Sequence, residues 1–248
     1  MPHPARRDDL SRFLVHLTRD YEESTARANL FGMLKDKQIE ARNAHCLFKH
    51  EITNLGFSAV LTKAFHTVCL TETPLPQIHR LTGAIPGRRI ELQAYGLVFN
   101  KDHLIERGAS PAIYLNAKGT KLRTYLLERF RKDFTGITRY QTLRQQQAAH
   151  FESIIQYYAL INIIADNYDF MWEREWRHSG PLTFKYRDLV AIIAPQPDGF
   201  RAYCAKRLST SAMRFVNMIP IIAPTWSYED IVETMSVTIW NANREPAD

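Results

Sequence analysis

Short segments rich in apolar and β-forming residues lie on both sides of a longer stretch that has helical periodicity. Within that stretch, Leu122 to Phe130 and Phe151 to Ile161 repeat apolar residues at intervals of three and four, which predicts two helices. The flanking segments predict strands at 13–17, 65–70, 95–99 and 111–115 before it and at 182–186, 189–195 and 218–224 after it. Several strands interrupted by helices predict an α+β fold with a helical insert at about 120–168.

The chain contains no internal repeat and no linker rich in Gly, Ser or Pro, so its 248 residues predict a single domain, 1–248. Shorter helices are expected at 29–39 and 102–108, and a closing helix at 228–235 after Ser227 as its cap. The order of the strands in the sheet does not follow from these patterns.

The composition is that of an ordinary globular protein, with 45% hydrophobic and 23% charged residues. Apolar runs such as Leu189 to Pro195 are too short to cross a bilayer, and the first residues lack the apolar core of a signal peptide. Cys46, Cys69 and Cys204 are far apart and form no CxxC pair, so neither a zinc site nor a disulfide framework is indicated. We therefore expect a cytoplasmic protein with no membrane partner.

The net charge of +6 predicts attraction to polyanions. Basic residues cluster in the segment 118–144, where Tyr125, Phe130, Phe134 and Tyr140 are interleaved with them. Positive charge combined with aromatic rings is typical of surfaces that bind single-stranded nucleic acid. Two simpler alternatives remain open: a solvated basic surface, and aromatic residues that form the core face of a helix.

Polar residues at the ends of two predicted strands are the first candidates for a site. His16 and Thr18 close the first strand, although a single His between apolar residues is usually structural. Thr71 lies in the sequence VCLTETPL, where a strand runs into hydroxyl and carboxylate side chains, which also occur in plain turns.

The sequence DFMWEREWR at 169–177 is the third candidate. On a strand, Glu173, Glu175 and Arg177 would share one face, while Trp172 and Trp176 would share the other and pack in the core. The alternative is an amphipathic edge strand with structural ion pairs.

Together these segments follow the three-part layout of the ADP-ribosyltransferase fold. The sequences VHLTR and NLFGMLKDKQIEA resemble the opening of DarT-type ADP-ribosyltransferases and RNA 2′-phosphotransferases, with Asp20–Ala28 interposed between the two motifs. CLTETPL, YGLVFNKDHLIERGASPAIYL and DFMWEREWR resemble AbiGi-type abortive phage-infection proteins. The matching segments, 13–41, 66–75, 95–115 and 168–195, cover about half of the chain.

The resemblance implies a mixed or antiparallel sheet of the ADP-ribosyltransferase type, with NAD as a substrate and no metal. It assigns catalysis to Glu175 and His16, with Glu175 on the ribose 2′-hydroxyl. Thr18 and Thr71 would support the NAD site together with His16, and Arg177 (or Arg174) would pair with a pyrophosphate oxygen. His16, Thr71 and Glu175 are then expected around one pocket. The protein would be a toxin or an antiviral, abortive-infection effector, and nucleic acid is a possible acceptor.

Two other functions stay open. A non-catalytic antitoxin or sensor subunit of a defence system would keep the same scaffold and bind a cognate partner. A metal-dependent nuclease using Asp169, Glu173 and Glu175 is disfavoured, because no second acidic cluster with suitable spacing occurs. Nothing resembles a Gly-rich dinucleotide-binding or phosphate-binding loop.

Overall fold

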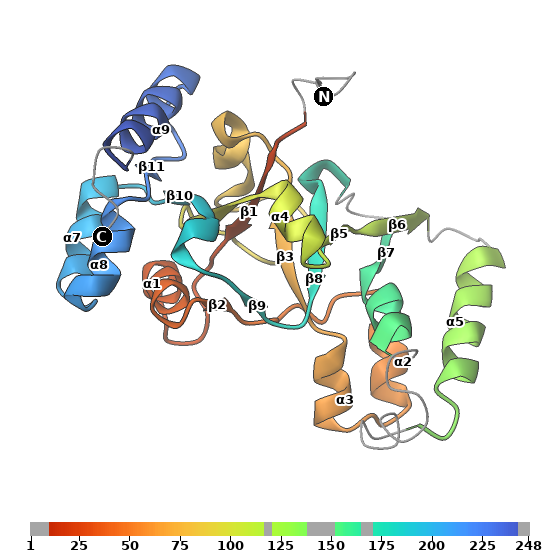
Figure 1. The fold of residues 1–248 in the computed structure, drawn as a ribbon. Helices are drawn as coiled ribbons and strands as arrows, with labels where there is room; N and C mark the ends of the chain where they lie inside the picture. The colour runs from red at the N-terminus through yellow and green to blue at the C-terminus, as the bar shows by residue number, and fades with distance from the viewer. Residues whose placement is uncertain (1–9, 117–120, 138–151, 165–170, 243–248) are drawn as a thin grey trace. The chain divides into compact units, whose positions relative to one another are not determined.

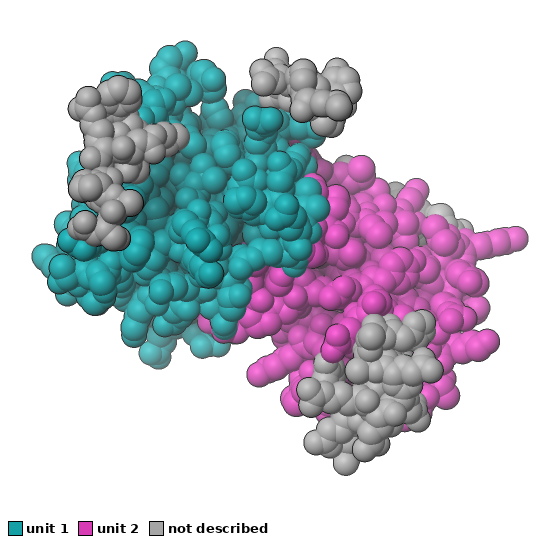
Figure 2. Space-filling view, viewed as in Figure 1, with its two compact units in different colours: residues 1–38, 70–107, 183–248 teal, residues 39–69, 108–182 magenta. Residues whose placement is uncertain are grey.

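The chain folds into two compact units, each built from discontinuous segments (Figures 1 and 2). The computed structural model describes residues 10–116, 121–137, 152–164 and 171–242. Unit 1 comprises residues 1–38, 70–107 and 183–248, and unit 2 comprises residues 39–69 and 108–182. Helices and a mixed sheet make this an α+β protein, and the expectation of one ADP-ribosyltransferase-like domain stays a prediction.

The strands of unit 1 are β1 (Phe13–Leu17), β4 (Gly96–Asn100), β10 (Leu189–Ile193) and β11 (Ile221–Ile222), in the order β11-β10-β4-β1. β4 is antiparallel to both β1 and β10, whereas β10 and β11 are parallel, so the sheet is mixed. β3 (Thr67–Thr71) pairs with β1 through Val15 and Thr71. A Cβ at position 96 would lie 2.5 Å from the His16 carbonyl oxygen, so glycine is required where β4 passes β1.

Seven helical segments complete unit 1: α1 (Ala26–Asp36), η1 (Leu75–Leu81), α4 (Lys101–Glu106), η3 (Tyr186–Asp188), α7 (Pro197–Ala205), α8 (Thr210–Asn217) and α9 (Tyr228–Ala242), counted over the described residues. Side-chain caps define several starts: Thr25 accepts from Ala28 N, and Asn100 accepts from the first amides of α4. The buried face of the sheet packs against η1 and α9 through Val15, Leu17, Leu75, Ile78, Leu81, Val98, Ala191, Ile193, Ile222 and Ile231.

Unit 2 contains the start of β3, then β8 (Glu175–Ser179) and β5 (Ser110–Pro111), in the order β3-β8-β5. β6 (Ile113–Asn116) and β7 (Ile161–Ile164) form a separate parallel pair. Helical segments are α2 (Lys49–Asn54), α3 (Ala59–Ala64), α5 (Lys121–Asp133), a helix over 152–160 and η2 (Met171–Glu173). The short strands β2 (Gln38–Ile39) and β9 (Leu182–Thr183) pair with each other.

Aromatic rings fill the core of unit 2. Phe48 and Phe130 stack with their centroids 4.6 Å apart, and Phe134 and Tyr158 pack edge-on or tilted around Phe130. Phe130, on the core face of α5, and Phe134, which directly follows the helix, are both buried and not available to stack on nucleic acid. Only Tyr125 of the described aromatics in 118–144 is exposed.

Two arginines of α5 also form ion pairs with carboxylates of the same chain. Arg131 makes two 2.7 Å hydrogen bonds to Glu51, and Arg129 pairs with Asp133. The rest of the predicted basic segment, including Arg139, Tyr140 and Arg144, lies outside the described residues. Of the alternatives that the sequence left open, the helix core face is therefore confirmed for Phe130, and Phe134 is buried directly after the helix.

The structure also shortens several predicted strands. The expected strand at 218–224 reduces to β11, because the amides of Met218 and Ile219 donate back to the last turn of α8. The expected strand at 182–186 reduces to β9, and η3 begins at Tyr186. The predicted strand over 172–177 begins only at Glu175: residues 171–173 form η2, and Arg174 has a φ of 46°. The prediction that Trp172 packs in the core is wrong, since 42% of the residue is exposed.

Among the residues that the structure describes, no helix is both long and apolar enough to cross a bilayer.

Candidate functional site

A buried ion pair on β8 is the centre of the candidate site in unit 2. Glu175 and Arg177 are two residues apart, so a strand projects both side chains from the same face. Arg177 Nε lies 2.9 Å from Glu175 Oε1, and its Nη2 lies 3.1 Å from Oε2, which is a bidentate pair. Only 1% of the Arg177 side chain and 11% of the Glu175 side chain are exposed. Glu173 lies on η2 and does not share this strand face, contrary to the expected alternation.

The helix over 152–160 fixes the other end of the guanidinium. Arg177 Nη1 donates to the Ala159 carbonyl oxygen at 2.7 Å. This carbonyl belongs to the last turn of the helix, where backbone oxygens lack partners within the helix and attract cations. This third hydrogen bond fixes the orientation of the Arg177 guanidinium. The bidentate pair then fixes the orientation of the Glu175 carboxylate.

Two further donors, from β3 and β6, converge on Glu175. The Cys69 thiol donates to Oε1 at 3.1 Å, and the Tyr114 hydroxyl donates to Oε2. The Asn43 amide donates to the Cys69 sulfur at 2.8 Å, so the thiol is itself held in place. Each carboxylate oxygen thus accepts from Arg177 and from one neutral side chain.

The Arg177 guanidinium determines the charge state of this cluster. Burial by itself raises the pKa of Glu175, but the charge of Arg177 and the hydrogen bonds from Arg177, Tyr114 and Cys69 outweigh it, so the pKa lies below the usual value. Burial and the Glu175 charge raise the pKa values of the Cys69 thiol and of the Tyr114 hydroxyl. The site therefore holds one carboxylate anion, one guanidinium cation and two protonated donors at neutral pH.

His45 adds a neutral imidazole to this part of unit 2. Burial lowers its pKa below 6.5, and the positive charge of Arg177 lowers it further, while Glu175 and a hydrogen bond with Asn162 act in the opposite direction. The imidazole is uncharged at pH 7 and able to accept a proton.

The depressed pKa of Glu175 predicts a specific loss of stability in acid. The ionised pair contributes its full stabilisation above the unfolded-state pKa of about 4.5, and the contribution is lost as the pH falls through the lower folded-state pKa. Urea titrations at pH 7, 5, 4 and 3 should therefore show a steeper fall in the free energy of unfolding for the wild type than for Glu175→Gln below about pH 4.5. All other carboxylates titrate in both proteins, so a difference between the two curves of unfolding free energy against pH comes from Glu175. Parallel curves would show that the folded protein does not stabilise Glu175 as an anion.

Three of the residues predicted for the site belong to unit 1. His16 is half-buried at the penultimate position of β1, opposite Leu97 of β4. The Thr71 hydroxyl lies 2.8 Å from that of Thr73 and also accepts from the Thr73 amide, which is the turn chemistry considered as its alternative role. Glu175 and Arg177 belong to unit 2, and the expected common pocket of His16, Thr71 and Glu175 stays a prediction.

Thr18 holds the loop that separates the two opening motifs. Its buried hydroxyl donates to the Ala26 carbonyl oxygen at 3.0 Å, and the Asp20 carboxylate accepts from the Ala26 amide at 2.6 Å. The loop is thereby closed, and the Asn29 side chain donates to the Arg19 carbonyl oxygen at 2.8 Å. The interposed Asp20–Ala28 therefore folds back and brings the Asn-Leu motif next to the end of β1.

Sequence reasoning missed Cys69, Tyr114 and His45 as members of the site. The alternation of side chains along β3 could have indicated Cys69, because Cys69 shares a strand face with Thr71, the residue of this strand that the resemblance assigns to the NAD site. Tyr114 lies in a predicted strand, but no local pattern relates it to Glu175, which is 61 residues away. The short strand β5 provides that relation, since the Ala112 amide donates to the Glu175 carbonyl oxygen at 2.9 Å.

Comparison with known proteins adds no identification. No protein-family model matches the chain, and no curated protein and no solved structure shows significant similarity to it.

Proposed function

We propose that the protein is an ADP-ribosyltransferase that consumes NAD⁺ and acts as a toxin or as an antiviral, abortive-infection effector. The observation that carries the proposal is the anionic, rigidly oriented carboxylate of Glu175 at the start of β8. The closed loop that joins the His16-x-Thr18 motif to Asn29 supports it, because the resemblance to DarT-type enzymes rests on those two motifs.

The reaction breaks the bond between nicotinamide and ribose. The bonding electron pair leaves with nicotinamide, and the ribose C1′ gains positive charge before the acceptor's oxygen or nitrogen bonds to it. A fixed carboxylate near the ribose stabilises that charge without reorganising during the reaction. Glu175 meets this requirement, since Arg177 keeps it ionised and oriented.

The acceptor must also lose a proton. A carboxylate with a lowered pKa is a weak base, so Glu175 is better suited to charge stabilisation than to proton removal. We assign His45 as the proton acceptor, because the charges of Arg177 and Glu175 both act on its imidazole, which places it at this site, and because the imidazole is unprotonated at neutral pH.

Substrate binding requires one of the protein's own donors to leave Glu175. Both carboxylate oxygens accept from protein groups, so a ribose hydroxyl would replace either the Tyr114 hydroxyl or the Cys69 thiol. The Arg177 pair can remain, because it uses different lone pairs and is held at Ala159. In this proposal the two neutral donors occupy the place of the substrate's hydroxyl groups.

The four hydrogen-bond donors around the Glu175 carboxylate also favour a second function, that of a non-catalytic antitoxin or sensor subunit. A carboxylate that accepts from four donors and is nearly buried is also the arrangement of a structural ion pair. The nuclease alternative gains no support, because both oxygens of Glu175 accept from the Arg177 guanidinium; Asp169 lies outside the described residues. In the described part of the chain, no three His, Cys, Asp or Glu side chains are grouped as metal ligands.

Incubation with NAD⁺ labelled in the adenylate part tests the proposal. The protein is mixed with separate pools of RNA, DNA and protein, and both nicotinamide release and transfer of label are measured. Release with label on one pool would support the transferase and identify the acceptor class. Neither release nor transfer, with a protein whose circular dichroism shows it folded, would favour the non-catalytic function.

A further inference from the structure

The positive charge of this protein is concentrated in two segments that come together in unit 1. Residues 26–37 and 185–217 contain nine Lys or Arg and three Asp, with no Glu. Their net charge of +6 equals that of the whole chain, so the remainder is neutral overall. The segments contain α1, η3, β10, α7 and α8, a different region from the basic segment around α5.

Contacts between these elements form one continuous surface. Phe31 of α1 packs edge-on against Tyr203 of α7, and the Tyr186 hydroxyl of η3 donates to the Leu34 carbonyl oxygen of α1 at 3.0 Å. Arg201 of α7 donates to the Val216 carbonyl oxygen of α8 at 3.1 Å. Figure 1 shows α1, α7 and α8 side by side. We call this surface the basic face, and its exposed cations are Arg27, Lys35, Lys37, Lys185, Arg187, Lys206, Arg207 and Arg214.

Two aromatic sites lie among these cations. Tyr186 and Phe215 stack with their centroids 5.6 Å apart, and 52% of Phe215 is exposed. The Lys37 ammonium lies 5.2 Å from the Tyr186 ring centroid. The ring of Tyr203 is contacted by two guanidinium groups, those of Arg27 at 4.5 Å and Arg207 at 3.9 Å.

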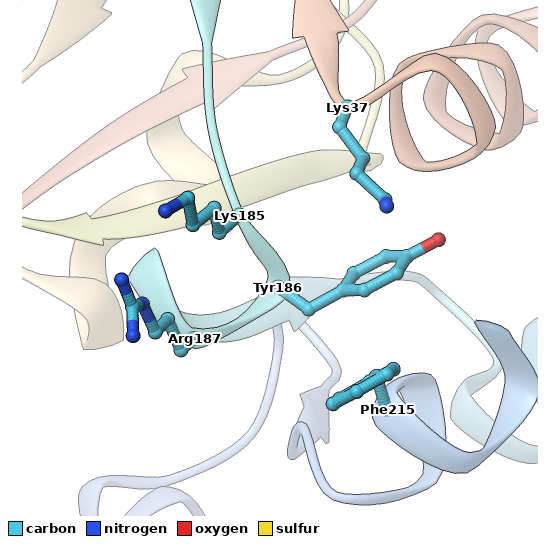
Figure 3. Close-up of a pocket in the computed structure, with 5 residues that line it drawn as sticks. All are labelled: Lys37, Lys185, Tyr186, Arg187 and Phe215. Carbon is cyan, nitrogen blue, oxygen red and sulfur yellow. The ribbon is translucent and has the colours of Figure 1, made fainter. Parts of the chain in front are cut away.

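A pocket of about 280 Å³ lies at the first aromatic site. Its lining consists of Tyr186, Phe215 and the three cations Lys37, Lys185 and Arg187, without a carboxylate. Figure 3 shows the Tyr186 ring extending toward Lys37 with Phe215 beside it, whereas the Lys185 and Arg187 side chains extend together in another direction. The nearby Asp188 carboxylate is paired with Arg107, so it does not neutralise these cations fully.

From this arrangement we infer that the basic face binds single-stranded nucleic acid, with a base stacked on Phe215 at the pocket and phosphates on Lys185 and Arg187. Exposed aromatic rings beside cations are what such strands require, since every base has a face that stacks and every phosphate carries a charge. The cations extend over four elements and away from the pocket, which suits a strand of several nucleotides better than one mononucleotide. An anionic membrane would instead favour apolar side chains projecting from the surface, whereas the aromatic pair here lines a pocket.

Binding is tested without NAD⁺, so the result does not depend on the proposed reaction. The anisotropy of a fluorescein-labelled oligo(dT) of about 20 nucleotides is followed with the full chain at about 50 and 200 mM salt. We expect Phe215→Ala to weaken binding by about 5- to 150-fold, the effect of losing one stacked base. Lys185→Glu/Arg187→Glu should weaken binding by about tenfold or more and reduce the dependence of log K on log salt by about 1.4, the value for two lost phosphate contacts.

A matched control separates this surface from general charge effects. Lys63→Glu/Arg89→Glu makes the same change in net charge at two exposed residues outside the basic face. The control should retain more affinity than Lys185→Glu/Arg187→Glu, and circular dichroism checks that each variant folds. Equal losses in the two double variants, no wild-type binding up to about 100 µM at low salt, or binding only to phosphatidylserine vesicles would each overturn the inference.

Discussion

Replacing Glu175 with glutamine is expected to reduce NAD⁺ consumption about 100- to 1000-fold. Glutamine keeps the size of the side chain but removes the charge that stabilises the cation at C1′, and loss of such a preorganised contact costs about 3–4 kcal/mol in the transition state. Nicotinamide release by wild type and variant measures the effect. Glu173→Gln is the comparison, and because η2 carries Glu173 away from the strand face of Glu175, its effect should be smaller.

The same substitution is also expected to lower the free energy of unfolding. A carboxylate in an exposed cleft would contribute about 1 kcal/mol or less, but Glu175 is nearly buried and faces a guanidinium that is 1% exposed. Removing one partner of a buried pair costs about 3–5 kcal/mol. The retained amide oxygen should keep the loss near the lower end of that range.

Activity must therefore be compared between folded molecules. Phe130→Leu provides the control, because it weakens the aromatic core of the same unit by about 1–3 kcal/mol without touching Glu175. If Phe130→Leu keeps its turnover at a temperature where both variants are folded, the loss in Glu175→Gln is chemical. Turnover retained by a folded Glu175→Gln protein would exclude the role assigned to Glu175.

Arg177→Met is expected to cause the largest loss of stability, about 3–5 kcal/mol. It removes the three hydrogen bonds of the guanidinium and leaves the Glu175 carboxylate buried with only Tyr114 and Cys69 as donors. For a chain of this length the melting temperature should fall by about 6–20 °C. Urea denaturation measures the change in the free energy of unfolding.

The double variant Glu175→Gln/Arg177→Met distinguishes a buried ion pair from two independent contributions. Once both charges are absent, neither is left buried without its partner, so the double variant should be less destabilised than the sum of the single variants. Additive losses would show that the two residues stabilise unit 2 separately. A loss near zero in Arg177→Met would show that the pair contributes little.

Local patterns in the sequence determined much of the secondary structure. A short apolar run predicted the β1 segment with its correct ends, and helical spacing placed Leu126 and Phe130 on the core face of α5, although Leu122 and Tyr125 of the same predicted face are exposed. Such features depend on residues within one or two turns of each other, which the sequence displays directly. The i, i+2 spacing also placed Glu175 and Arg177 on one strand face, as the structure has it.

Only the tertiary structure decided what those residues meet. The sequence could not show that Cys69, Tyr114 and the Ala159 carbonyl oxygen surround the pair, because these groups come from separate elements up to 106 residues away. The burial of Glu175 depends on the same long-range packing. Its carboxylate is therefore a nearly buried anion paired with the Arg177 guanidinium, and not an exposed one. The basic face arises similarly: residues 26–37 and 185–217 are each moderately basic, and the contacts of Tyr186 and Tyr203 join them into one surface.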